Sequence, residues 1–427
     1  MRSMSASQAS SINLSAIFMS TFNINLREAI YTLSDALDLV GVTHIHHGKR
    51  VAYMAAECGK YMGWSQQQMD DLFQAAILHD CGVSRTYIHR RLAQFEWENE
   101  NEHCVLGANL LNTCPLMANL APIVRYHHTH WSELKNMDLP LEVKLNANCI
   151  YLVDRVDVLS LAFLVDQSNL LLGREQIRTK ILEKRGEWFC PELVDAFIEL
   201  SRSDKFWLSL ERGHVNGYVT VWLAETKARE MDFQELRSIV KIFSFIVDAK
   251  SPFTKSHSDG VARLSRLIGT LFNLPEQNCE MLEFAGLLHD LGKLRQPDEL
   301  LDKPGKLTSD EYSQIQQHSF DTYSILKNMH GLETITQWAA EHHERLDGTG
   351  YPNHLNWSVL SLEARIVAVA DVFQALAQTR PYRASVGKAE IMEILNKMAV
   401  DEKLDREVVG YVSNNLDDCY AAAIAET

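Results

Sequence analysis

Apolar residues recur with helical spacing along most of the 427-residue chain. Leu282–Leu288 and Leu362–Leu376 are segments of this kind, and Phe233–Lys250 is a longer one. Thr308-Ser-Asp-Glu311 places Thr and Glu three residues apart, a capping-box pattern that predicts the start of a further helix. Since no region is rich in strand-like alternation, the pattern predicts an all-α protein.

The middle of the chain is less regular. Glu187–Arg202 reads as an amphipathic helix that starts near Pro191, and Lys205–Glu211 continues it. Tyr218–Leu223 is β-branched and aromatic, which predicts a short strand or a buried turn. Within the following long helix, four apolar residues are expected in the core, with a dimer seam as the alternative: Phe243, Phe245, Ile246 and Val247.

Histidine and aspartate recur in two ordered sets with matching spacing. The sets are His47, His79, Asp80, His103, His127, His128 and Asp154, then His257, His289, Asp290, His318, His342, His343 and Asp371. The first interval is 79 − 47 = 32 in one set and 289 − 257 = 32 in the other. A later interval is 127 − 103 = 24 and 342 − 318 = 24. This agreement indicates an internal duplication.

The second set has the composition of a metal centre. Any one of these residues alone is more often a histidine at the edge of the core or an ion-paired aspartate, but seven in order favour metal ligation. A mixed, histidine-rich set suits two divalent transition metals, Fe, Mn, Ni, Co or Zn, better than Ca. Adjacent helical residues point about 100° apart, so Asp290 is expected to bridge two metals while His289 binds one. Two metals in one pocket suit the cleavage of phosphate esters.

Residues 341–352 read Glu-His-His-Glu-Arg-Leu-Asp-Gly-Thr-Gly-Tyr-Pro. Further motifs are His257-Ser-Asp-Gly-Val261, Leu288-His-Asp-Leu-Gly-Lys293, His318, Val369-Ala-Asp-Val372 and Thr379-Arg-Pro-Tyr-Arg383. Together they resemble the HD-GYP family of phosphodiesterases, which hydrolyse cyclic dinucleotides. The resemblance covers residues 240–400 in the family's order.

The resemblance implies an enzyme that converts cyclic di-GMP or 3′,3′-cyclic GMP-AMP to a linear product. It assigns phosphate binding to Arg380 and Arg383 and places Tyr351 at the pocket. Lys293, one turn beyond the bridging Asp290, is expected to act on the phosphate or the leaving group.

Ion pairs of Glu344, Arg345 and Asp347 are expected to hold the Gly-Tyr-Pro loop. Two positions depart from the family pattern: Gln374 stands where Asp is frequent, and Phe253 stands where some members carry a Glu for a third metal. Two metals are therefore predicted.

The two copies differ where chemistry is expected. Val83 stands at the position of Lys293, and the first copy has no Gly-Tyr-Pro loop. The first copy is therefore expected to be degenerate and regulatory, and whether it binds metal or another ligand stays open. The predicted organisation is a polar tail (1–24), an N-terminal HD-like domain (25–185), a helical connector (186–230) and a catalytic HD-GYP domain (231–427).

Composition narrows the class of partner and the location. The net charge of −15 argues against binding of polymeric nucleic acid. Eight scattered cysteines without a Cys-x-x-Cys pair indicate reduced thiols, so a bacterial cytoplasmic protein is expected. Since the sequence has no apolar run of 18 residues or signal-peptide pattern, no membrane association is expected.

Two other functions remain open from the sequence. A different metal-dependent phosphohydrolase is disfavoured by the Gly-Tyr-Pro loop, which such enzymes do not need. A non-catalytic receptor is disfavoured by the complete ligand set and Lys293. The preferred dinucleotide, the final product, the metal and a possible homodimer are left undecided.

Overall fold

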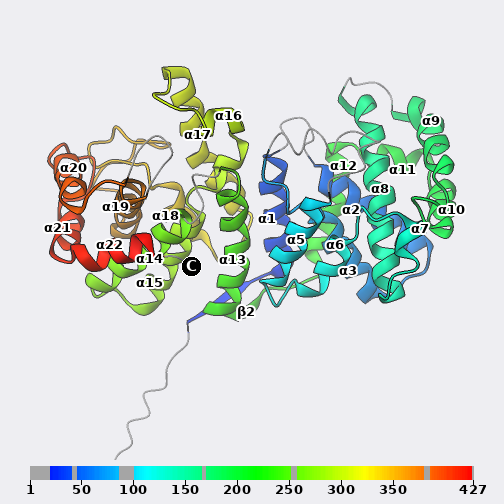
Figure 1. The fold of residues 1–427 in the computed structure, drawn as a ribbon, viewed down its shortest axis with the longest axis horizontal. Helices are drawn as coiled ribbons and strands as arrows, with labels where there is room; N and C mark the ends of the chain where they lie inside the picture. The colour runs from blue at the N-terminus through cyan, green and yellow to red at the C-terminus, as the bar shows by residue number, and fades with distance from the viewer. Residues whose placement is uncertain are drawn as a thin grey trace, which may run out of the picture.

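The computed structural model describes residues 20–40, 46–85, 101–165, 170–251, 257–378 and 385–425. Figure 1 shows two helical lobes side by side, and the described residues confirm the predicted all-α class apart from one two-stranded sheet. The first lobe contains α1 (Leu26–Asp38), α2 (His47–Tyr61), α3 (Gln66–Ile77), α5 (Glu102–Asn112), η1 (Ala118–Leu120), α6 (Ala121–Arg125), α7 (Trp131–Leu134), α8 (Leu141–Val165), α9 (Leu170–Glu183), α10 (Pro191–Leu200), α11 (Asp204–Leu208) and α12 (Arg212–Ala224). The second contains α13 (Phe233–Asp248), α14 (His257–Leu271), α15 (Glu276–Leu288), η2 (Leu291–Arg295), α16 (Asp298–Leu301), α17 (Ser309–Leu326), α18 (Glu333–Ala340), α19 (Leu362–Ala377), α20 (Lys388–Val400), α21 (Arg406–Asn414) and α22 (Leu416–Ile424).

A short antiparallel sheet joins the two lobes (Figure 1). Strand β1 (Thr21–Ile24) pairs with β2 (Arg229–Asp232), which directly precedes α13. Phe22 of β1 is buried, and its ring centroid lies 5.5 Å from that of Phe284 in α15 of the second lobe. The expected polar tail at 1–24 is therefore wrong for its last four residues, which form this strand.

The expected connector packs as part of the first lobe. Helices α10 and α12 contact α2, and α11 contacts α9. Tyr218–Leu223 lies inside α12, so the predicted strand or turn is wrong. Its aromatic residues face other aromatic rings, with the Trp222 centroid 4.5 Å from that of Phe73. Tertiary packing has overridden the strand propensity of these residues.

Two helices of the second lobe begin with capping boxes. At α17 the Thr308 side chain accepts a hydrogen bond from the Glu311 backbone N–H, and Glu311 accepts one from the Thr308 backbone, as predicted. Asp232 and Glu235 form the same arrangement at α13. Each box satisfies backbone donors that the first helical turn leaves unpaired.

Helix α13 lies mainly in the core. Phe243, Ile246 and Val247 are buried, which confirms the core interpretation for these three, whereas Phe245 is 52% exposed. The alternative, a dimer seam, stays a prediction. Of the four residues, only Phe245 is exposed enough to contact a second chain.

The first lobe contacts the elements that carry predicted site residues. Helix α1 contacts α17 and η2 of the second lobe. Asn328 Nδ2 donates to Asp35 Oδ2 at 3.2 Å, and the His330 backbone N–H donates to Glu28 at 3.1 Å. The first lobe therefore supports the helix of His318 and the turn of Lys293.

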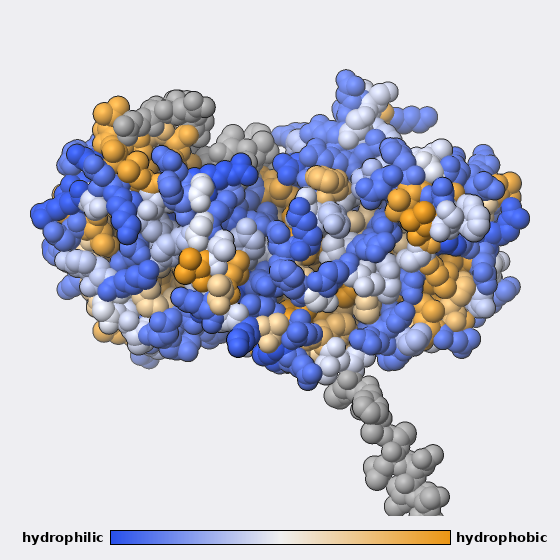
Figure 2. All heavy atoms as spheres, turned by 180° about the vertical axis from the view of Figure 1, so that it is seen from behind, coloured by the Kyte–Doolittle hydropathy of each residue, from blue (hydrophilic) through white to orange (hydrophobic). Residues whose placement is uncertain are grey.

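The surface seen from behind is mostly hydrophilic, with apolar residues gathered in several separate groups (Figure 2). Among the residues that the structure describes, no helix is both long and apolar enough to cross a membrane.

Gly292 allows η2 to approach α17 closely. A Cβ atom at this position would lie 2.0 Å from the carbonyl oxygen of His318. The Gly292 N–H donates to Thr322 Oγ1 at 2.9 Å, and that hydroxyl donates to the His289 carbonyl at 3.1 Å. The turn after Asp290 and the helix of His318 are thus held together at this glycine.

Gly292→Ala is expected to destabilise the protein by about 1–3 kcal/mol because the added methyl group must push α17 away from η2. The free energy of unfolding from denaturant titration measures this. Gly410→Ala is the matched control, since no atom lies within 4 Å of the added Cβ in the interior of α21. This control should be neutral or more stable by up to about 1 kcal/mol, and equal destabilisation of both variants would contradict the argument.

Candidate metal centre and active site

The carboxylate of Asp290 lies between two groups of histidines. Its Oδ2 is 3.6 Å from His257 Nε2 and 3.3 Å from His289 Nε2. Its Oδ1 is 3.5 Å from His318 Nε2 and 3.9 Å from His342 Nε2. One oxygen therefore faces each group, which is the arrangement expected of a bridging ligand.

Asp371 and His343 complete the two groups. Asp371 Oδ1 lies 3.3 Å from His257 Nε2, and the ligand atoms of His257, His289 and Asp371 all lie within 4.8 Å of one another. The ligand atoms of His318, His342 and His343 meet the same limit. All seven residues predicted for the second copy thus converge on one site.

Five separate elements bring these side chains together. His257 begins α14, and His289 and Asp290 follow α15 directly. His318 lies in α17, His342 and His343 follow α18, and Asp371 lies in α19.

Hydrogen bonds fix the orientation of the imidazoles. The Nδ1–H groups of His289, His318 and His342 donate to backbone carbonyls of Gly286, Ile315 and Ala339, at 2.6–2.8 Å. His257 Nδ1 instead donates to Gln374 Oε1 at 2.5 Å. Each ring therefore directs its Nε2 to the centre of the site, which leaves this nitrogen available to ligate a metal. Gln374, considered above only as a departure from the family pattern, orients His257.

The donor set fits divalent metal ions. His289 Nε2 and Asp290 Oδ1 are buried and form no hydrogen bond to any described residue. Such atoms are costly to bury unless another partner satisfies them. Burial lowers the pKa of His318 to about 4, which leaves this imidazole neutral and able to ligate at neutral pH.

Lys293 lies directly beside the bridging carboxylate. Its Nζ is 2.5 Å from Asp290 Oδ2, and its side chain is 23% exposed. Burial alone would raise the pKa of Asp290, but His289 and Lys293 hold this pKa well below its ordinary value. The site therefore combines an ionised carboxylate with an ammonium group that remains accessible to a substrate.

The Gly-Tyr-Pro loop returns to the site. The Tyr351 backbone N–H donates to the His343 carbonyl at 3.2 Å, and the two ring centroids are 4.9 Å apart. Gly350 permits this path because a Cβ there would lie 2.4 Å from the backbone of Glu344 and Arg345.

Hydrogen bonds from backbone N–H groups to the carboxylates of Glu344 and Asp347 hold the loop, in place of the expected ion pairs. Glu344 accepts from the N–H groups of Asn353 and Leu355 at 2.6 and 2.9 Å, and Asp347 accepts from that of Thr349 at 2.8 Å.

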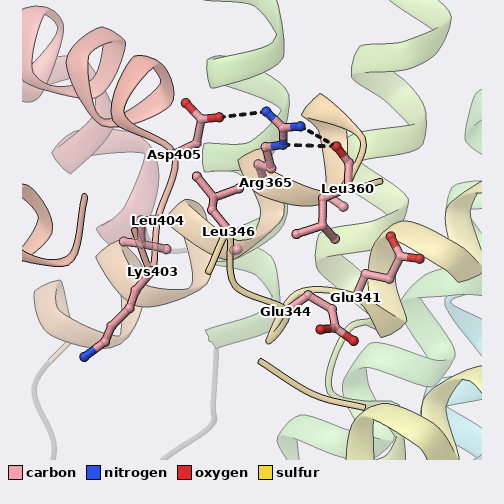
Figure 3. A pocket seen from close by; sticks show the side chains of 10 residues that line it. Glu341, Glu344, Leu346, Leu360, Arg365, Lys403, Leu404 and Asp405 are labelled. Carbon is pink, nitrogen blue, oxygen red and sulfur yellow. Dashed lines mark hydrogen bonds and ion pairs between the residues drawn. The ribbon is translucent and has the colours of Figure 1, made fainter. Parts of the chain in front are cut away.

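Arg345 donates to the Thr349 hydroxyl at 3.4 Å. Among the described residues, Glu344, Arg345 and Asp347 form no ion pair, so the expected ion pairing is wrong. Figure 3 shows a small pocket lined by Glu341, Glu344 and Leu346, at which Arg365 donates hydrogen bonds to the Leu360 carbonyl and to Asp405.

Three predicted positions lie outside the described residues. They are Arg380, Arg383 and Phe253. Their assigned roles stay predictions.

The first copy repeats the arrangement of ligands. Asp80 Oδ2 lies 3.7 Å from His47 Nε2 and 3.6 Å from His79 Nε2, while its Oδ1 lies 3.6 Å from His103 Nε2. The ligand atoms of His47, His79 and Asp154 lie within 4.8 Å of one another, as do those of His103, His127 and His128. Asp80 Oδ1 is buried and forms no hydrogen bond to a described residue. The seven positions of the first copy therefore also converge and fit metal.

The residues around this first site differ from those of the second. Asp157 accepts from His47 Nδ1 at 2.7 Å and pairs with Arg50, whereas Gln374 stands at its position in the second copy. Arg155 donates to Asp154 at 2.7 and 3.0 Å. Although burial lowers it, the pKa of His47 rises to about 10 through hydrogen bonds to Asp154 and Asp157. The sequence signal for Asp157, missed above, was its place three residues after Asp154.

Comparison with known proteins identifies the family. Profiles described as "HD domain" match residues 45–159 and 241–408. The chain is 38% identical over 411 residues to 3′3′-cGAMP-specific phosphodiesterase 1 of Vibrio cholerae, covering 95% of each protein. The chain belongs to the HD-domain phosphodiesterases of the HD-GYP type. 3′3′-cGAMP-specific phosphodiesterase 3 of the same organism is 28% identical, over 87% of this chain and 90% of that protein.

A solved structure supports the two-domain HD fold of this phosphodiesterase. The crystal structure of a cyclic GMP-AMP-specific phosphodiesterase of V. cholerae covers 93% of this chain and 98% of its own, with a TM-score of 0.62 and 23% identity.

Replacing both His289 and Asp290 with Ala is expected to lower the metal bound per chain, because the change removes the bridging carboxylate and one imidazole. Elemental analysis of the purified protein measures the metal, and circular dichroism checks that the helical content is retained. Full metal content in this folded variant would show that the second copy does not hold the ions.

Proposed function

We propose that this phosphodiesterase hydrolyses a cyclic dinucleotide to a linear product, with 3′3′-cyclic GMP-AMP as the preferred substrate. The observation that carries the proposal is the position of Asp290. Each of its two carboxylate oxygens faces one group of ligands, and Oδ2 also contacts Lys293. Identity to the cGAMP-specific relative over 95% of both proteins supports the choice of substrate over cyclic di-GMP.

Each residue of the site has a defined task in this proposal. The seven ligands of the second copy would hold two divalent metals, Fe, Mn, Ni, Co or Zn, and Asp290 would be a ligand shared by both groups. Metals bound there supply an activated water and neutralise phosphate charge. Lys293 contacts a phosphate oxygen or donates a proton to the leaving 3′-oxygen. Arg380 and Arg383 bind the phosphates, and Tyr351 borders the substrate.

Product analysis tests the substrate. Purified protein is incubated with 3′3′-cyclic GMP-AMP, cyclic di-GMP or cyclic di-AMP, and chromatography follows linear dinucleotides and mononucleotides over time. The fastest turnover is expected for cyclic GMP-AMP, with none by the His289→Ala, Asp290→Ala variant. Faster turnover of cyclic di-GMP would overturn the preference, and no turnover of any cyclic dinucleotide by metal-loaded protein would overturn the function.

We infer a different task for the first domain. Its ligand set fits metal, yet Val83 replaces the lysine and the domain lacks a Gly-Tyr-Pro loop. A metal site that cannot position a dinucleotide is a poor catalyst for its cleavage. Contacts of α1 with α17 and η2 support regulation or stabilisation of the second domain by the first.

Lys293→Ala is expected to reduce kcat for the cyclic dinucleotide by roughly 10²-fold, because one proton donor or electrostatic contact is lost. Steady-state kinetics measure the rate, and elemental analysis should show unchanged metal. Loss of metal, rather than of rate per bound metal, would assign Lys293 to the integrity of the site.

Replacing His79 and Asp80 with Ala is expected to change turnover of the full chain far less than the same change at His289 and Asp290. Parallel kinetic assays of the two double variants, with metal analysis of each, make the comparison. An equal loss of activity would mean that both domains share the chemistry.

A further inference from the structure

A row of aromatic rings extends from the metal-ligand cluster. Tyr351 lies with its ring centroid 4.9 Å from that of His343 and 6.3 Å from that of His318. Tyr312 follows at 6.5 Å from Tyr351, with the two ring planes at 89°. The row therefore leads from two ligand histidines to a tyrosine that no motif singled out.

Tyr312 is placed by the same helix that places His318. The two residues are six positions apart in α17, which corresponds to about 9 Å along the helix axis. The contact with Tyr351 spans α17 and the Gly-Tyr-Pro loop, so Tyr312 is held at a fixed distance from the ligands by both.

Much of the Tyr312 side chain is open to solvent rather than packed against the protein. The residue is 43% exposed. Since its ring meets Tyr351 edge to face, an aromatic surface remains available for a further ring. An open aromatic surface beside a phosphate-cleaving centre suits a nucleobase, whose stacking on an aromatic side chain is a common mode of recognition.

We propose that Tyr312 binds a purine base of the substrate by stacking, so that Tyr312 and Tyr351 form an aromatic wall that positions the dinucleotide. This inference rests on the proposed function for its substrate and adds a residue to the site. One base of a cyclic dinucleotide lies on this wall while the adjoining phosphate lies over the ligand cluster.

Tyr312→Ala is expected to raise KM for the cyclic dinucleotide by about tenfold, in line with the loss of one stacked base, with metal content unchanged. Tyr312→Phe should keep a KM within about twofold of the original protein, because stacking needs the ring and not the hydroxyl. Tyr323→Ala is the matched control, since Tyr323 lies on the same helix with 47% exposure.

A base-specific readout separates this inference from the proposed function. Hydrolysis of bis(p-nitrophenyl) phosphate is measured with GMP or with ribose 5-phosphate as inhibitor, two compounds that differ by the base. The ratio of their inhibition constants gives the preference for GMP. Tyr312→Ala should reduce the preference for GMP by about tenfold, whereas Tyr312→Phe and Tyr323→Ala should retain it. This result would support stacking even if no cyclic dinucleotide were cleaved.

Three results would overturn the inference. One is an unchanged preference for GMP in Tyr312→Ala. Another is an equal loss with both inhibitors, which would indicate a structural role. The third is a loss of metal in Tyr312→Ala.

Discussion

The second domain is organised around one buried carboxylate. Asp290 is 2% exposed, yet His289 and Lys293 keep it ionised. Burying an ionised group is affordable only when opposite charges or metals surround it. Lys293 supplies one such charge, and metals held by the two groups of imidazoles, one group at each carboxylate oxygen, would supply more. Much of the local backbone serves this arrangement: three imidazoles are fixed by carbonyls of their own helices, and the turn after Asp290 is pressed against α17 at Gly292.

The two domains have the same set of ligand residues, but different residues bind those ligands from behind. In the first domain, Asp157 binds both His47 and Arg50, and Arg155 binds the ligand Asp154. In the second, Gln374 binds His257, and the position of Arg50 is Gly260, whose added Cβ would lie 2.7 Å from Gln374. A charged partner increases the basicity of a ligand imidazole more than a neutral amide does. Arginine on a ligand carboxylate has the opposite effect on that ligand, so the two centres differ in electronic character despite the same geometry.

The sequence predicted the site better than the connections around it. The intervals of 32 and 24 residues, together with the His-Asp, His-His and later Asp motifs and the family resemblance, selected all fourteen residues that converge. Strands β1 and β2 were not predicted, since four residues carry little local signal and their pairing joins positions such as Phe22 and Met231. Helix α12 was missed because its aromatic and β-branched residues resemble a strand until their partners on α2 and α3 are known. The sequence could not predict a role for Tyr312, because its contact with Tyr351 depends on how the Gly-Tyr-Pro loop folds back to α17.

The contact between the domains gives the first domain a physical route to the chemistry. Helix α1 touches both α17, which carries His318 and Tyr312, and η2, which carries Lys293. The same two elements are packed against each other at Gly292, where a displacement of one requires the other to move. A ligand or metal that shifts α1 would therefore act on a metal ligand, the lysine and the aromatic wall together. Asp38 of α1 lines a small cavity with His47, His79 and Asp80, so the helix that touches the second site also borders the first. Helix α1 therefore links the ligand cluster of the first domain to α17 and η2 of the second.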